Sequence, residues 1–194
     1  MTPTVHLTGD ERVDDLLSSD PNALLIGMVL DQQVPMEKAF SGPRVIADRM
    51  GGRFDVGAIA AMPVDDFVAV CSERPAVHRF PGSMGKRVHE VCRALVDDWD
   101  GDASRLWGSA GTGAELKKLI SDLPGFGPAK AAIMVALLGK RYGVTPEGWR
   151  EAAGDFGESG VFRSVADVVD QTSLQKVRET KKAVKAQARA AADG

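Results

Sequence analysis

The sequence predicts an all-α protein made of many short helices. Helix-start signals recur at short intervals along the whole chain. Runs of strictly alternating apolar and polar residues, typical of half-buried strands, are scarce. Of the 194 residues, 44% are apolar and 26% charged, a balance that excludes a largely disordered chain. A chain of this length forms one compact domain or two small lobes.

Two start signals lie near the N-terminus. Thr8 followed by Glu11 has the pattern of a capping box and predicts a first helix. Asp20 followed by Pro21 predicts a second start, with Asp as the N-cap and Pro in the first turn. The run that follows, through Gln33, is apolar almost all round, which is typical of a fully buried helix.

The middle of the chain continues in short helical segments. We expect helix over 36–40, a break at Ser41-Gly42-Pro43, and a further helix that ends at Gly51-Gly52. Asp55 and Pro63 each precede another short apolar helix. The longest helix of this part is expected over 82–99, where apolar residues recur every three or four positions.

The last third of the chain contains the same kinds of helix-start signal. Capping-box or Pro signals predict helices opening at Thr112, Pro128, Thr145, Ser164 and Thr172, which brings the total to about ten or eleven. The segment 154–160 contains three glycines and is expected to be a flexible connection.

Composition excludes several kinds of site. Cys71 and Cys92 cannot build a disulfide framework or supply the four ligands of an iron–sulfur cluster. With only His6, His78 and His89 in addition, no dedicated zinc site is expected. No apolar run approaches the roughly 18–20 residues of a membrane span, and no secretory signal is evident. We therefore expect a cytoplasmic protein with reduced thiols.

The charge balance does not by itself favour a nucleic-acid partner. The formal net charge is −3 and the pI is about 5.6, whereas affinity for DNA comes largely from Lys and Arg that neutralise phosphates. A local basic face is compatible with an acidic protein, because the distribution of charge matters more than its sum.

The stretch 116–138, LKKLISDLPGFGPAKAAIMVALL, carries the most chemical information. It predicts two helices joined by a very tight turn, Leu-Pro-Gly-Phe-Gly. Gly125 and Gly127 permit positive φ and close approach of a ligand to bare backbone, and Phe126 between them can anchor the turn. The second helix begins at Pro128, and the free N–H groups at such a start bind phosphate. An ordinary connection between two helices is the alternative.

This Leu-Pro-Gly-Phe-Gly-x-x-x-Ala pattern, ending at Ala131, resembles the helix-hairpin-helix of the HhH-GPD superfamily of base-excision DNA glycosylases, which includes endonuclease III. Two further segments are similar to the family. LLIGMVLDQQV matches the buried helix that precedes a Gln near the target base, and a basic segment precedes the hairpin. The chain is most similar to a small bacterial subfamily without an iron–sulfur cluster.

The resemblance implies two helical lobes with a groove between them. A six-helix barrel-like lobe would span 21–141, and 1–20 would join 142–194 as the second lobe. The implied partner is double-stranded DNA, which suits a nucleoid-associated protein, and family hairpins often bind a monovalent cation, here at Gly125–Gly127. The implied DNA contacts are Gln32, Gln33, Arg79, Lys86, Arg87, Gly125, Phe126, Gly127, Pro128 and Lys130.

The sequence departs from the family pattern at its catalytic residues. The Lys that forms a Schiff base in strand-cutting members is replaced by Ala129, and Lys130 stands one residue later. Lyase activity is therefore not expected, and Lys130 is expected to contact phosphate or to be solvent-exposed. Thr145 occupies the place of the usual Asp. The carboxylates that could substitute are Asp31, Glu147 and Asp155, each with a surface charge or cap as its alternative role.

Three functions follow, in order of preference. The first is a monofunctional DNA glycosylase with atypical catalytic residues. The second is a non-catalytic module of the same fold that binds lesions or bent duplex, and the third is a domain that binds protein only. The C-terminal helix over 172–194, basic in an acidic protein, either lies along DNA backbone or is a solvated tail.

Overall fold

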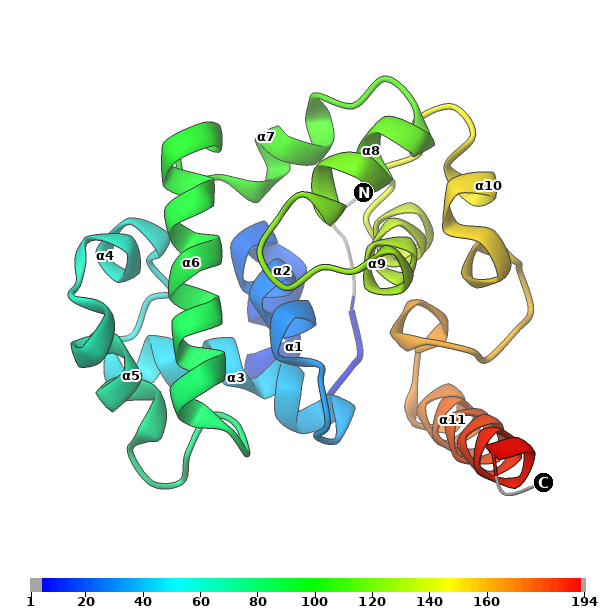
Figure 1. Ribbon diagram of the computed structural model, residues 1–194, viewed down its shortest axis with the longest axis horizontal. Helices are drawn as coiled ribbons and strands as arrows, with labels where there is room; N and C mark the ends of the chain where they lie inside the picture. The colour runs from blue at the N-terminus through cyan, green and yellow to red at the C-terminus, as the bar shows by residue number, and fades with distance from the viewer. Residues whose placement is uncertain (1–4, 193–194) are drawn as a thin grey trace.

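The computed structural model describes residues 5–192, and Figure 1 shows their all-helical arrangement. Within these residues no β-strand forms. The all-α prediction is confirmed. The α-helices are α1 Glu11–Ser19, α2 Pro21–Leu30, α3 Met36–Arg49, α4 Val56–Ala61, α5 Val64–Ser72, α6 Pro81–Trp99, α7 Ala103–Gly108, α8 Gly113–Ser121, α9 Pro128–Arg141, α10 Trp149–Ala153 and α11 Gln171–Ala192. Two short 3-10 helices, η1 Gly154–Gly157 and η2 Val165–Asp167, precede α11.

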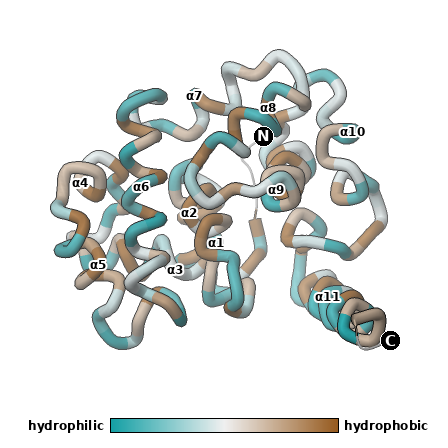
Figure 2. Tube along the Cα trace, in the orientation of Figure 1, coloured by the Kyte–Doolittle hydropathy of each residue, from teal (hydrophilic) through white to brown (hydrophobic). Residues whose placement is uncertain are grey.

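Helix α2 lies at the centre of the molecule, as its apolar composition predicts. Asp20 caps it by accepting hydrogen bonds from the backbone N–H groups of Asn22 (2.8 Å) and Ala23 (3.2 Å). Every residue from Ala23 to Leu30 is buried, and hydrophobic residues cluster on the inner helices in Figure 2. The helix ends at Leu30 rather than at Gln33, so the two glutamines lie in the bend that leads to α3.

The predicted break at Ser41-Gly42-Pro43 is wrong, because α3 runs unbroken from Met36 to Arg49 with Pro43 inside it. Packing against α2 compensates for the hydrogen bond that Pro43 cannot donate. A Cβ on Gly42 would lie 2.4 Å from Leu30 Cδ1, so the two helices touch at this glycine. Tertiary contact therefore overrides the local signal.

The capping signals of Thr112, Asp55 and Ser164 are confirmed. The Thr112 hydroxyl accepts from the N–H of Glu115 at 3.2 Å, and the Glu115 carboxylate accepts from the N–H of Thr112 at 3.2 Å. Ser164 forms the equivalent capping box with Asp167 at the start of η2. These short-range polar contacts fix where α8 and η2 begin.

Three predicted helix starts need correction. Asp10, not Thr8, caps α1, because Thr8 instead donates to the buried carboxylate of Asp14 at 2.9 Å. Asp170, not Thr172, accepts from the N–H of Ser173 at 2.7 Å at the start of α11. No helix opens at Thr145; its segment is extended, and the next helix, α10, begins after Gly148.

The helices group around α6 on one side and α9 on the other. Helices α4 and α5 pack on α6, whereas α8, α10, η1 and η2 pack on α9. Two contacts join the N-terminal segment to later parts of the chain: the Tyr142 hydroxyl donates to the Leu17 carbonyl, and Gly9 contacts Gln171. The buried side chains form one continuous cluster. Among the helices within residues 5–192, none is both long and apolar enough to span a membrane.

Candidate nucleic-acid interface

The bend between α8 and α9 has the tight geometry that the Leu-Pro-Gly-Phe-Gly sequence predicts. Phe126 is buried and anchors the bend in the core. Gly125 has φ +84°, a conformation that favours glycine. Gly127 differs from the expectation, because its φ is −83° and an added Cβ would meet nothing within 4 Å. The fold therefore does not require glycine at position 127.

Two backbone donors of the bend are not used in backbone hydrogen bonds. Within residues 5–192, the N–H groups of Gly125 and Gly127 have no backbone acceptor. Gly127, Pro128 and Ala129 are exposed, so side chains do not seal the start of α9. An open helix start with free N–H groups is an anion-binding arrangement.

Two cations flank this bend. Arg87 of α6 lies across Gly125, where an added Cβ would be 2.7 Å from the guanidinium Nη1. Lys130 is half-buried and donates from Nζ to the Val29 carbonyl of α2 at 3.1 Å. Burial lowers the pKa of Lys130, the nearby charge of Asp31 opposes this, and that of Arg87 adds to it. Lys130 is therefore not fully solvent-exposed, and its amine lies against the end of α2.

The bend after α2 carries both glutamines. Gln32 and Gln33 are exposed, and Gln33 has φ +58°, an uncommon conformation for a residue other than glycine. The buried imidazole of His78 hydrogen-bonds to the Gln32 carbonyl at 2.8 Å. Strained backbone of this kind is maintained by the surrounding structure and clusters at functional sites.

A basic rim lies beside the glutamines. Gln33 lines an open cavity of about 910 Å³ together with Lys38, Arg74 and Arg79. The Arg79 guanidinium lies over the exposed ring of Phe80, 5.3 Å from its centroid. Lys86 is exposed one residue before Arg87 on α6. The predicted basic segment therefore lies near both bends.

A second cavity, of about 820 Å³, opens next to the start of α9. Its walls are largely apolar and come from α9, α10, η1 and α11, with charged side chains among the lining residues. Pro128 and Ala129 line it on the α9 side, and Lys181 and Lys185 line it on α11. Ala129, which stands where the resemblance would place a Lys, therefore lines this cavity.

The three candidate acids lie in different places. Asp31 lies at the end of α2, with its side chain 15% exposed and its carboxylate 4.0 Å from Lys181 Nζ. Asp155 lines the 820 Å³ cavity, but its side chain is 83% exposed and pairs with Arg163 at 3.5 Å. Glu147 lies apart from both, where its backbone carbonyl accepts from Gly113 N–H at the start of α8.

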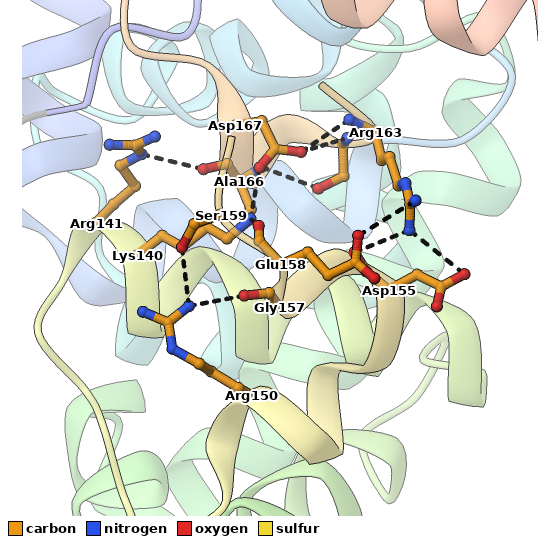
Figure 3. A network of polar contacts seen from close by, with 11 residues as sticks. Lys140, Arg141, Arg150, Asp155, Gly157, Glu158, Ser159, Arg163, Ala166 and Asp167 are labelled. Carbon is orange, nitrogen blue, oxygen red and sulfur yellow. Dashed lines mark hydrogen bonds and ion pairs between the residues drawn. The ribbon is translucent and has the colours of Figure 1, made fainter. Parts of the chain in front are cut away.

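Polar contacts hold the glycine-rich segment for which the sequence predicts flexibility (Figure 3). Arg150 donates to the Gly157 carbonyl at 2.8 Å, and Lys140 donates to that of Glu158 at 2.6 Å. Lys140 also forms a buried ion pair with Asp167 at 2.6 Å. The network explains how a segment rich in glycine holds Asp155 at the cavity.

Sequence reasoning missed the roles of His78 and Lys181. His78 supports the glutamine bend from 46 residues away, and no local pattern marks such a contact. The sequence marks Lys181 only as one member of a basic helix, and its approach to Asp31 depends on where α11 lies. The described residues contain no group of three or more His, Cys, Asp or Glu side chains placed to hold a metal.

Comparison with known proteins adds no relative. No protein-family model, no curated protein and no solved structure matches this chain. The geometry of the two bends is therefore the basis for assigning a function.

Proposed function

We propose that this protein binds double-stranded DNA through the α8–α9 bend and acts as a monofunctional DNA glycosylase of the helix-hairpin-helix kind. The single observation that carries the proposal is the exposed backbone of Gly127. Its N–H has no backbone acceptor among the described residues, it is exposed, and the fold itself has no need of a glycine there. A phosphate that approaches the bare backbone explains all three properties.

Charge around the bend supports the same interpretation. Arg87 and Lys130 place two cations beside the free N–H groups, and Arg79 and Lys86 extend the positive charge along the α6 side. These contacts would neutralise backbone phosphates and position the duplex without reading its sequence. Gln32 and Gln33, both exposed on a bend whose Gln32 carbonyl is hydrogen-bonded to His78, would fill the space left by an extruded nucleotide.

Asp31 is the carboxylate best placed to act in hydrolysis. In the proposed step, water forms a bond to C1′ of the extruded nucleotide while the C1′–N bond breaks and the base leaves. The Asp31 carboxylate would accept the proton from that water and stabilise positive charge on the sugar. Asp31 lies beside Gln32 and has limited exposure, whereas the side chain of Asp155 is 83% exposed. Both properties favour Asp31 over Asp155 for this role.

A Schiff-base route has little support. Ala129 offers no amine, and the Lys130 amine is directed to the Val29 carbonyl. If the bend binds a monovalent cation, as the resemblance implies, its backbone carbonyls would be the ligands, since residues 123–127 include no acidic side chain. The Leu123 carbonyl already accepts from Phe126 N–H at 3.2 Å. None of the proposed steps depends on this ion.

The test is release of free base from duplexes that each carry one damaged or mismatched base. We expect excision of at least one lesion, without strand cleavage. Asp31→Asn should slow excision by about 10²–10⁴-fold while leaving duplex affinity intact, since this is the usual contribution of one acid–base group. Asp155→Asn is the matched control and should keep its rate. Loss of excision in the Asp155 variant alone would overturn the assignment of Asp31.

A second candidate, a non-catalytic DNA-binding module, is favoured by one observation. Asp31 lies near two cations, Lys181 and Lys130, and such pairing is equally suited to a structural role. Duplex binding with no excision across the whole lesion panel would favour this module. No salt-dependent duplex binding at all would contradict both candidates.

A further inference from the structure

Helix α11 separates from the body of the protein after its first turns. Its buried residues are Ser173, Leu174 and Val177, and every residue of 181–192 is exposed. This exposed part consists mostly of Ala, Lys, Arg and Gln, which are strong helix formers, so it remains helical without packing. Figure 1 shows α11 nearly end-on at the edge of the molecule. The core therefore does not account for the length of this helix.

The cations of α11 form a stripe along one side. At 3.6 residues per turn, five of them fall within about 100° of arc and span about 16 Å of helix. They are Arg178, Lys181, Lys182, Lys185 and Arg189. Glu179 lies outside this arc, where its carboxylate accepts from the Gln175 amide at 3.0 Å. We call these five residues the α11 stripe.

The first part of the α11 stripe is fixed by contacts with α3 and with the end of α2. Arg178 forms an ion pair with Glu37 of α3, and Lys181 Nζ lies 4.0 Å from the Asp31 carboxylate. The α11 stripe therefore starts beside the bend that carries the two glutamines. It then passes along the 820 Å³ cavity, which Lys185 lines opposite the start of α9.

We propose that the α11 stripe is a second DNA-binding surface, which holds backbone phosphates of the same duplex that the α8–α9 bend contacts. The inference rests on the proposed function and extends it to a separate element. Because phosphates follow one another by about 3.4 Å of rise along one strand, a 16 Å stripe would span about five of them. Contacts of Lys and Arg to phosphate would add affinity and orientation rather than sequence preference.

The chemistry of the surface favours DNA over a protein partner. Among the described residues of α11, Val184 is the only large hydrophobic side chain that is strongly exposed, at 59%. Protein interfaces have an apolar core and are depleted in Lys. The Lys and Arg side chains of the α11 stripe instead complement a polyanion.

The experiment measures how duplex affinity depends on salt. The triple variant Lys182→Gln, Lys185→Gln and Arg189→Gln removes three charges and keeps helix-forming residues. Its slope of log K against log[salt] should be shallower than that of the wild type by about 0.9 for each phosphate that the variant no longer neutralises. The control variant Arg12→Gln, Arg53→Gln and Arg105→Gln removes the same charge from exposed ion pairs that include no residue of the α11 stripe, and it should keep the wild-type slope. Circular dichroism should show folded helix in both variants.

The outcomes separate the two proposals. If the wild type binds duplex with a steep salt slope and both triple variants match it, the α11 inference is overturned and the proposed function stands. The same result is expected if the α11 stripe binds an acidic protein instead. If the wild type shows no salt-dependent binding, the proposed function fails and the α11 inference fails with it.

Discussion

His78 supports Gln32 through a hydrogen bond of 2.8 Å between its imidazole Nε2 and the Gln32 carbonyl. The other ring nitrogen, Nδ1, accepts from the backbone N–H of Phe80 at 3.0 Å, so the proton of the neutral ring must be on Nε2. One buried side chain thus joins the bend that carries the glutamines to the start of the basic helix α6. A second proton on the ring would occupy Nδ1 and break the hydrogen bond with Phe80.

This arrangement predicts a loss of stability at mildly acidic pH. Burial lowers the pKa of His78, and the charges of Lys38 and Lys130 act in the same direction. As the pH falls below about 6.5, the unfolded chain takes up the proton first, so the folded state loses the contribution of His78. The difference in Tm between wild type and His78→Gln should shrink between pH 7.5 and pH 5. A constant difference would show that His78 has the same pKa in the folded and the unfolded chain.

Lys130 predicts that folding stability changes at alkaline pH rather than at acidic pH. Because burial lowers its pKa in the folded protein, the unfolded chain binds more protons in the window below the ordinary Lys pKa of about 10.4. Folding stability contributed by Lys130 therefore rises as the pH increases through that window. Relative to Lys130→Met, the wild type should gain in Tm between pH 8 and pH 10. Parallel curves for the two proteins would contradict the half-buried position of this amine.

Arg87 should contribute one phosphate contact, and Arg93 should contribute none. Both are on α6, and six residues place them on different sides of the helix. Arg87→Gln is expected to reduce the salt slope of duplex binding by about 0.9, whereas Arg93→Gln should leave it unchanged. Equal effects of the two substitutions would mean that overall charge, rather than contact at the bend, controls affinity.

Substitutions of two glycines should change stability in opposite directions. An added Cβ at Gly113 would lie 2.4 Å from Trp149 Cα, and backbone cannot move aside cheaply. Gly113→Ala should therefore cost about 1–3 kcal/mol in the free energy of unfolding. Gly127→Ser meets open space at an ordinary φ and places a capping hydroxyl at the N-cap of α9, so it should stabilise the fold by about 0.4–1 kcal/mol. Chemical denaturation measures both; destabilisation by Gly127→Ser would show that the fold needs this glycine.

Local signals in the sequence predicted much of the fold. The Asp20-Pro21 start, the Thr112 capping box and the Leu-Pro-Gly-Phe-Gly bend all depend on residues within one helical turn of each other. Such local contacts do not depend on where the segment lies in the folded protein, so the sequence alone predicts them. Gly42-Pro43 shows where this reasoning fails, because packing of α3 against Leu30 preserves a helix that local preference would break.

The candidate site could be predicted only in part, since it is built from distant segments. The sequence indicated the bend and the two glutamines, but not that His78 would support one of them. The hydrogen bond of Lys130 to Val29 and the approach of Lys181 to Asp31 join residues 101 and 150 positions apart. Periodicity carries no information about such pairs, because the relative positions of α2, α9 and α11 decide them.

The most direct test of DNA binding at the bend compares Gly127→Asp with Gly127→Asn. Both side chains suit the N-cap position of α9, and Asp also interacts favourably with the positive end of the helix, so neither variant should melt below the wild type. The two differ in one charge, located where the phosphate would bind. Duplex affinity of Gly127→Asp should fall below that of Gly127→Asn by at least about tenfold at low salt. Equal affinity in the two variants, at the wild-type level, would contradict the claim that this bend holds the DNA backbone.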